Sequence, residues 1–253
     1  RFSTRFHLEG NYNQTFRFNS CDINQDVKIS HAKFDNQLRI DDGAVRGDLY
    51  ITGVDISEEF ILEEFTLPRK VVISECDVQE FSCNPEGGLP SIVDLRAGTK
   101  IHEGTFGLAS DNDVFYDLAH CTIGDVQLDL DSGDFEHYLF KSTKFDGFDF
   151  IGIKDELARN NFEIHTFGYP EDLFTESAIY PNQDRSLNEG YEESTKLQYQ
   201  TETYTRAKNG AKTIGAESIE SGFFVKQKEA DRAKLRHQLK KTEDEKEKRR
   251  LKR

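Results

Sequence analysis

The sequence predicts a mainly β protein in which a β-solenoid is followed by a C-terminal α-helical hairpin and a charged tail. Three observations lead to this prediction. Apolar or small residues recur in an eleven-residue pattern between Phe16 and Phe81, a strict five-residue pattern runs from Leu128 to Gly152, and helical spacing of apolar residues begins after Lys196. With 253 residues, the chain has ample material for a continuous apolar core.

The eleven-residue repeat holds without a gap through six blocks, which read FRFNSCDINQD, VKISHAKFDNQ, LRIDDGAVRGD, LYITGVDISEE, FILEEFTLPRK and VVISECDVQEF. The first, third, sixth and eighth positions of a block are apolar or small, so each block is a five-residue unit followed by a six-residue unit. A helix would need a spacing near 3.6 residues, and an ordinary strand would alternate for longer before turning. The pattern therefore predicts a chain that turns a corner every five or six residues.

Four such sides make a coil of about 22 residues, and coils stack at the ~4.8 Å separation of hydrogen-bonded strands. Side chains 22 positions apart then lie in columns that fill the axis and leave no pore. The predicted core consists of the large apolar residues at these inward positions, namely Phe18, Ile23, Ile29, Phe34, Ile40, Val45, Ile51, Ile56, Leu62, Leu67, Ile73, Val78, Ile123, Leu130, Phe135, Phe140, Phe145 and Phe150.

A family resemblance rests on the short units CDINQ, AKFDN and CTIGD, and on the consecutive units LDLDS, GDFEH, YLFKS, TKFDG and FDFIG. These units resemble the A(D/N)LXX signature of the pentapeptide-repeat family. The resemblance implies a right-handed quadrilateral β-helix over residues 1–152. Two features depart from the family pattern: the alternating five-and-six spacing, and the stretch 84–110, where Pro85 and Gly87 are among the turn residues that predict a loop insertion.

The region after the solenoid is predicted to be helical at both ends. A capping helix is expected within 153–165, where Ile153 and Leu157 would cover the last coil, and 166–194 is expected to be an irregular linker. Residues 195–253 are expected to form a helical hairpin and a basic tail. Apolar residues at helical spacing are Leu197, Tyr204, Ala207, Ala211 and Ile214 in the first helix, and Ile219, Phe223, Phe224 and Ala230 in the second. The order of elements resembles large pentapeptide-repeat proteins of halophilic archaea.

Charge is unevenly distributed along the chain. The formal net charge is −14, although residues 229–253 contain 11 Lys and Arg against 6 Asp and Glu. The acidic body repels nucleic-acid phosphate and favours basic partners, so we expect no direct binding to nucleic acid. The basic tail could instead lie close to an anionic membrane.

The four cysteines, Cys21, Cys76, Cys83 and Cys121, show no C-x-x-C spacing and fall on inward positions of the repeat. We expect buried, reduced thiols, which suit the cytoplasm or the cytoplasmic side of a membrane. The solenoid pattern is already under way at the first residues, so we expect upstream sequence or another chain to cover that end, with oligomerisation through a solenoid end or the helical region.

The sequence offers no candidate catalytic, cofactor-binding or metal-binding residue. The seven histidines are scattered, and neither a nucleophile elbow nor a phosphate-binding glycine loop is present. The leading hypothesis is a non-catalytic scaffold or protein-interaction domain, part of a larger protein that is tethered to a membrane. The alternative is an acidic DNA mimic that binds a topoisomerase such as DNA gyrase, because similar family members occupy the DNA site of that enzyme.

Overall fold

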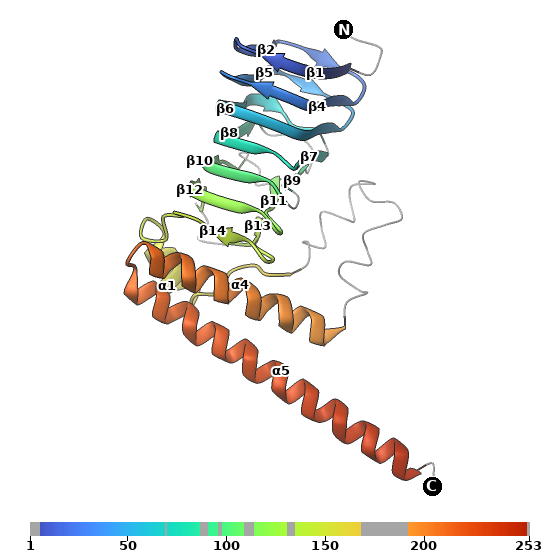
Figure 1. Cartoon of the computed structure of the whole chain (residues 1–253), viewed down its shortest axis with the longest axis vertical. Helices are drawn as coiled ribbons and strands as arrows, with labels where there is room; N and C mark the ends of the chain where they lie inside the picture. The colour runs from blue at the N-terminus through green and yellow to red at the C-terminus, as the bar shows by residue number, and fades with distance from the viewer. Residues whose placement is uncertain are drawn as a thin grey trace.

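The computed structural model describes residues 6–68, 70–86, 91–95, 98–108, 114–130, 135–167 and 192–251, without the side chains of 243–251. It shows a parallel β-solenoid of about six turns followed by two long helices (Figure 1). The strands are β1 (Phe6–Tyr12), β2 (Phe16–Asn19), β3 (Asp22–Ile23), β4 (Val27–Phe34), β5 (Leu38–Val45), β6 (Leu49–Thr66), β7 (Lys70–Ser74), β8 (Asp77–Glu86), β9 (Ser91–Leu95), β10 (Lys100–Phe106), β11 (Val114–Asp117), β12 (Thr122–Leu128), β13 (Tyr138–Leu139) and β14 (Lys144–Phe145).

Every strand pairing is parallel, and the pairing follows the predicted 22-residue coil. Phe18 pairs with Ile40 and Ile29 pairs with Ile51, so equivalent positions of successive coils lie side by side. The long strand β6 takes part in two neighbouring sides of the coil. Its first part pairs with β4 and β7, and its second part pairs with β5 and β8. The fold class predicted from the sequence is thus confirmed.

The prediction of a loop insertion at 84–110 is wrong for the described part of that range. Strands β9 and β10 lie there, paired in register with β7 and β8. The cause is a series of register shifts. Ile56 pairs with Val78 at a spacing of 22, but after a bulge Phe60 pairs with Phe81 at 21, and after a second bulge Thr66 pairs with Glu86 at 20. Lys70 pairs with Ile92 at 22 again, and Val78 then pairs with Ile101 at 23. A count fixed at 22 loses the pattern at each of these shifts.

The corner between the two units of each block is made by a residue with left-handed backbone geometry. Such residues recur every eleven positions through the first half of the solenoid: Ser20, His31, Asp42, Gly53, Glu64 and Glu75 have φ between 47° and 63°. Left-handed geometry costs a non-glycine residue about 1–2 kcal/mol, so its regular recurrence shows that the corner is imposed by the stacked coils.

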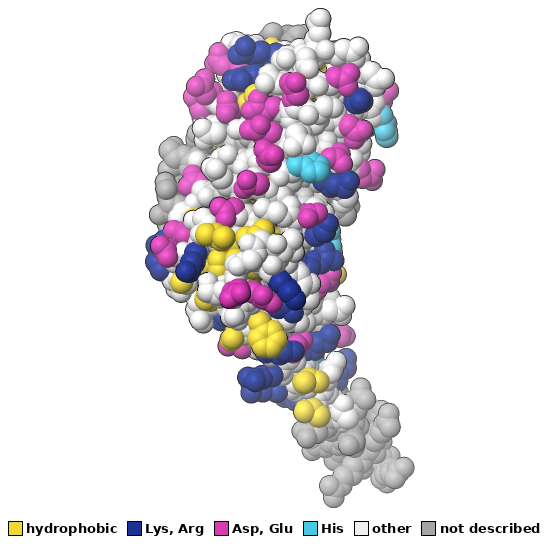
Figure 2. Space-filling view, turned by 60° about the vertical axis from the view of Figure 1, so that its left-hand side comes forward, with side chains coloured by type: hydrophobic (Ala, Val, Ile, Leu, Met, Phe, Trp, Pro, Cys, Tyr) yellow, Lys and Arg dark blue, Asp and Glu magenta, His cyan; other side chains and the backbone are white. Residues whose placement is uncertain are grey.

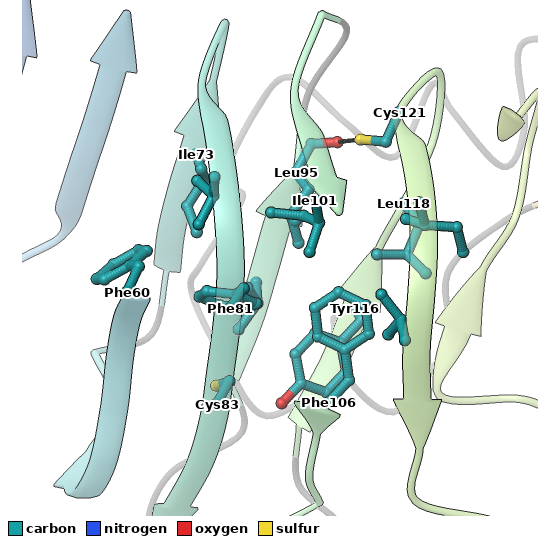
Figure 3. Packing of buried hydrophobic residues seen from close by; sticks show 14 of the residues in the cluster. Phe60, Ile73, Phe81, Cys83, Leu95, Ile101, Phe106, Tyr116, Leu118 and Cys121 are labelled. Carbon is teal, nitrogen blue, oxygen red and sulfur yellow. Dashed lines mark hydrogen bonds between the residues drawn. The ribbon is translucent and has the colours of Figure 1, made fainter. Parts of the chain in front are cut away.

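The core is a column of large side chains along the solenoid axis. Figure 3 shows Phe60, Phe81 and Phe106 from three successive coils, with Tyr116 of β11 beside Phe106, and the neighbouring ring centroids lie 5.0–5.5 Å apart. All four side chains are fully buried. Tyr116 satisfies its hydroxyl by donating to the carbonyl of Gly107 at 2.6 Å. Burial of these rings and their tilted ring-to-ring contacts stabilise the packing along the axis.

A second column, beside the corner, carries hydrogen-bond donors. Thr99 donates to the carbonyl of Ile73 in the preceding coil, and Thr143 donates to that of Leu118, at 3.1 and 2.7 Å. Cys76 and Cys121 occupy the equivalent positions and donate through sulfur, as Figure 3 shows for Cys121 and Leu95. We call these four side chains the donor column. They give the buried carbonyls beside the corner an additional partner.

In the described part of the chain after the solenoid, the helices are α1 (Lys154–Arg159), α4 (Glu193–Thr213) and α5 (Glu217–Leu251). Helices α4 and α5 form an antiparallel hairpin joined at Gly215, and α4 lies across the end of the solenoid (Figure 1). Leu157 in α1 is buried as expected, whereas Phe224 in α5 is 46% exposed, contrary to its expected place in the hairpin core. Phe223 takes that place against Phe150, because one residue along a helix turns the side chain by about 100°.

Helix α4 takes the place of a further coil. The corner residue Ser142 has φ 54°, and its amide donates to Thr203 Oγ1 at 2.9 Å while its carbonyl accepts from Arg206 at 2.6 Å. One coil earlier, the amide of His120 donates to the carbonyl of Lys141 instead. Thus α4 satisfies the backbone groups that another coil would have paired. The expected linker at 166–194 lies mostly outside the described residues.

Candidate functional site

The predicted core residues lie at the inward positions that the repeat predicts, and one of them is less buried than the others. All of them are buried except Leu130, which is partly buried against the core at the end of the described segment 114–130. These residues stabilise the rod and take no part in a surface site. Side chains able to act on other molecules must therefore be sought on the outward positions of the strands and on the helices.

One outward row of the sheet is wholly acidic. Glu59 on β6 pairs with Glu80 on β8, Glu80 with Glu103 on β10, and Glu103 with Asp125 on β12. We call these four residues the acidic ladder. Glu59 is half-buried and the other three are exposed. Because adjacent strands lie ~4.8 Å apart, the ladder presents four carboxylates in a straight row about 14 Å long.

The electrostatics of the ladder are unfavourable in the isolated chain. Burial raises the pKa of Glu59, and the negative charges of Glu80 and Glu63 raise it further. Within the described residues, no Lys or Arg forms an ion pair with a ladder carboxylate. Like charges directly opposite each other on neighbouring strands are destabilising. The ladder therefore carries repulsion that a cationic ligand would relieve.

A neighbouring row of the same sheet shows the contrasting arrangement. Lys33, Asp55, Asp77 and Lys100 are paired in this order on successive strands, so the row mixes both signs. Lys100 lies 3.0 Å from Asp77, and together with His102 it lowers the pKa of that carboxyl against the effect of burial. This row is internally neutralised, which makes the uniform sign of the acidic ladder a specific feature rather than a property of the whole sheet. Figure 2 shows acidic side chains gathered along the body of the solenoid.

The cysteines do not form a reactive site. Burial raises the pKa of Cys76 to about 11 and that of Cys83 to about 12, and it raises the pKa of Cys121 as well. These thiols stay protonated at neutral pH and are weak nucleophiles. Cys21 is only partly buried, contrary to expectation, because it lies in the first coils, where β3 pairs with β5 alone among the described strands.

The histidines stay apart from one another, as their scattered positions in the sequence suggest. His7 contacts Ser30 and Glu9, and His102 contacts Asp77. In the part of the chain that the structure describes, no three His, Cys, Asp or Glu side chains come together in a way that could hold a metal ion.

The junction between the solenoid and α4 gathers several cations. Lys141 lies 4.2 Å from the ring centroid of Tyr199, and the His120 ring lies 6.2 Å from the same ring. Burial lowers the pKa of His120 and the neighbouring Lys141 lowers it further, whereas Glu202 opposes the shift. Because burial also lowers the pKa of Lys141, this junction favours uncharged groups.

The sequence showed only that the body of the chain is acidic, and the ladder was missed. A signal does exist, since Glu103 and Asp125 are 22 positions apart, but the spacings of 21 from Glu59 to Glu80 and 23 from Glu80 to Glu103 conceal the row.

Among the described residues, no helix combines the length and the apolar character needed to cross a membrane. No protein-family model, curated protein or solved structure matches this chain.

Proposed function

We propose that this chain is a non-catalytic protein-interaction scaffold whose acidic ladder binds a basic segment of a partner protein. The observation that carries the proposal is the in-register row of Glu59, Glu80, Glu103 and Asp125. A rigid row of carboxylates is already ordered before binding, so a partner loses little affinity to rearrangement of the scaffold. The repulsion within the row falls when cations neutralise it.

The spacing of the ladder indicates the shape of the partner. Carboxylates recur every ~4.8 Å along the ladder. An α-helix with Lys or Arg on successive turns presents one cation about every 5.4 Å. Over four positions the two rows drift apart by roughly 2 Å, which the long flexible stems of Lys and Arg can absorb. We therefore expect the partner segment to be a helix with a basic stripe.

Charge-neutral variants of the full chain test this proposal. The ladder variant combines Glu80→Gln, Glu103→Gln and Asp125→Asn. A matched control combines Asp22→Asn, Asp55→Asn and Glu136→Gln, which are three exposed acids outside the ladder. The probe is a synthetic alanine-based helix with lysine on successive turns, and a peptide of the same composition with scattered lysines serves as its control.

We expect the ladder variant to lose at least about ten-fold in affinity for the striped helix, since each exposed charge pair contributes up to about 1 kcal/mol. The control variant should bind nearly as well as the parent chain, and binding should weaken as salt is raised. Equal loss in both variants would mean that net charge alone matters, and the ladder would then have no specific role.

A DNA mimic is the second candidate, because the ladder is a straight row of negative charges. Its charge density places it second: the ladder carries one charge per ~4.8 Å, whereas duplex DNA carries one per ~1.7 Å. Supercoiling by purified DNA gyrase in the presence of the chain separates the two functions. Inhibition that the ladder variant loses would favour the mimic and would count against the basic-helix partner.

We also propose that the chain is a pentapeptide-repeat protein. The support is the recurrence of buried phenylalanines every five residues at Phe135, Phe140, Phe145 and Phe150, together with small residues at Ala32 and Cys121 of the corner columns. The reduced, buried thiols support a reducing compartment, such as the cytoplasm. Measuring the handedness of the coils in a crystal structure would test the family assignment, which requires right-handed coils.

A further inference from the structure

Large exposed apolar side chains are concentrated on one helix. In the described part of the chain they are Phe224 (46% exposed), Val225 (53%), Leu235 (59%) and Leu239 (65%) on α5, and one more, Ile151 (57%), lies elsewhere. The opposite side of α5 is buried against α4 and the last coil through Ile219, Phe223 and Ala230. Thus α5 has two apolar sides, and only one of them is used inside the molecule.

The exposed side of α5 also carries positive charge. At about 100° per residue, Lys228 and Arg232 fall within the same outward arc as the four apolar side chains. Glu217 falls in this arc too, and Asp231 lies at its edge and forms an ion pair with Lys228 at 3.4 Å. Lys228 lies 5.5 Å from the ring centroid of Phe224. We call these six residues, Phe224, Val225, Lys228, Arg232, Leu235 and Leu239, the base stripe. Figure 2 shows hydrophobic side chains among Lys and Arg at this end of the molecule.

The geometry points to an anionic lipid bilayer as the occupant of the base stripe. We propose that α5 lies in the membrane interface with its apolar side chains among the headgroups and its cations against anionic lipid, so that the solenoid stands away from the surface. A helix with exposed bulky apolar residues flanked by Lys and Arg binds an interface in this way. The inference goes beyond the proposed function, which concerns a different face of the molecule.

The acidic body does not prevent this contact, because the hairpin separates it from the surface. Helix α4 lies between the solenoid and α5 (Figure 1). Packed helices are about 8–10 Å apart, and where Phe223 of α5 packs on Phe150 the last coil and one helix layer separate the acidic ladder from a surface that touches α5. The screening length is about 8 Å at physiological ionic strength. Repulsion by the body is therefore largely screened, whereas attraction by Lys228 and Arg232 is not.

A second copy of the chain fits the base stripe less well. An antiparallel pair of α5 helices with Leu235 of each chain beside Leu239 of the other would place Lys228 opposite Lys246 and Asp231 opposite Glu243. Facing like charges oppose such pairing. A bilayer imposes no such register, and its anionic headgroups complement the cations of the stripe.

Vesicle cosedimentation of the full chain tests the proposal, with vesicles rich in phosphatidylserine compared with vesicles of phosphatidylcholine alone. The parent chain should bind the anionic vesicles, and binding should fall as salt is raised. The double variant Leu235→Asp/Leu239→Asp should lower the partition coefficient at least about ten-fold, since each side chain loses its burial in the interface. Ile151→Asp is the matched control and should change binding less than about two-fold.

A charge-neutral pair separates electrostatic from apolar binding. Lys228→Gln/Arg232→Gln should lower the partition coefficient by roughly 10–30-fold on anionic vesicles, because each cation contributes about five-fold. Lys33→Gln/Lys144→Gln, on the solenoid, should change binding little. Circular dichroism verifies that each variant keeps its fold. Absence of vesicle binding by the parent chain, or unchanged binding by Leu235→Asp/Leu239→Asp, would overturn the proposal, as would a dimer that this variant converts to a monomer without any vesicle binding.

Discussion

Removal of one hydroxyl from the donor column tests whether these side chains hold neighbouring coils together. Thr99 is fully buried, and its hydroxyl donates to the carbonyl of Ile73 in the preceding coil at 3.1 Å. Thr99→Val keeps the shape of the side chain and removes only the donor. A lost hydrogen bond costs about 0.5–1.5 kcal/mol, and a buried carbonyl deprived of this partner adds to that cost, so we expect a loss of about 1–2 kcal/mol.

The assay is thermal unfolding followed by circular dichroism, together with hydrogen exchange of the amides in β7 and β9. In a chain of this size, 1 kcal/mol corresponds to about 2–4 °C in melting temperature. Hydrogen exchange is needed as well, because coils of a solenoid unfold in part independently. We expect faster exchange in β7 and β9 than in β1 and β4, which lie coils away from the change.

Two further substitutions complete the test. Thr105→Val changes an exposed threonine on β10 and should stay within about 0.5 kcal/mol of the parent chain. Thr99→Cys keeps a weak donor at a position of the column where Cys76 and Cys121 also serve, so its stability should fall between those of the parent and Thr99→Val. Equal melting temperatures for Thr99→Val and Thr105→Val would refute the role of the donor column.

Three other predictions concern the core, the cap and pH. Ile51→Asp should unfold several coils, because it buries a charge without a partner, whereas Glu58→Ala should leave the melting temperature nearly unchanged; similar losses would contradict the register. Gly210→Ala should cost about 1–3 kcal/mol, since its Cβ would meet Phe145 Cβ at 2.7 Å, and a melting temperature equal to that of the parent would show that α4 is loosely placed. The lowered pKa of His120 means that its contribution to stability is complete above about pH 6.5 and is lost as pH falls below that value, so His120→Gln should flatten the pH dependence of melting.

The repeat was predictable because burial requires an apolar or small residue at every equivalent inward position. Ile23 and Val45 are 22 positions apart, pair directly and are both buried, and nothing beyond the spacing was needed to expect this. The pattern was lost where the bulge after Ile56 made Phe60 pair with Phe81. A single extra residue reverses which side chains face inward, and no local property of the sequence marks where the chain absorbs it.

The candidate site and the cap could not be predicted for a related reason. The acidic ladder exists only once the register is known, and its members are ordinary charged residues until Glu80 and Glu103 are placed side by side. Thr203 and Arg206 reach Ser142 across more than sixty residues of chain. Helical periodicity predicted that α4 exists, but the partners of its polar side chains follow from tertiary packing alone.

The junction at Ser142 makes the rod adjustable in length. Helix α4 bonds to the solenoid at the last corner, and the described coils pair with the coils before and after them. Removal of residues 49–70 would bring Val27 next to Val71 and would shorten the rod by ~4.8 Å. If the strand face and the helical base each bind a partner as proposed, the number of coils sets the distance between the two partners.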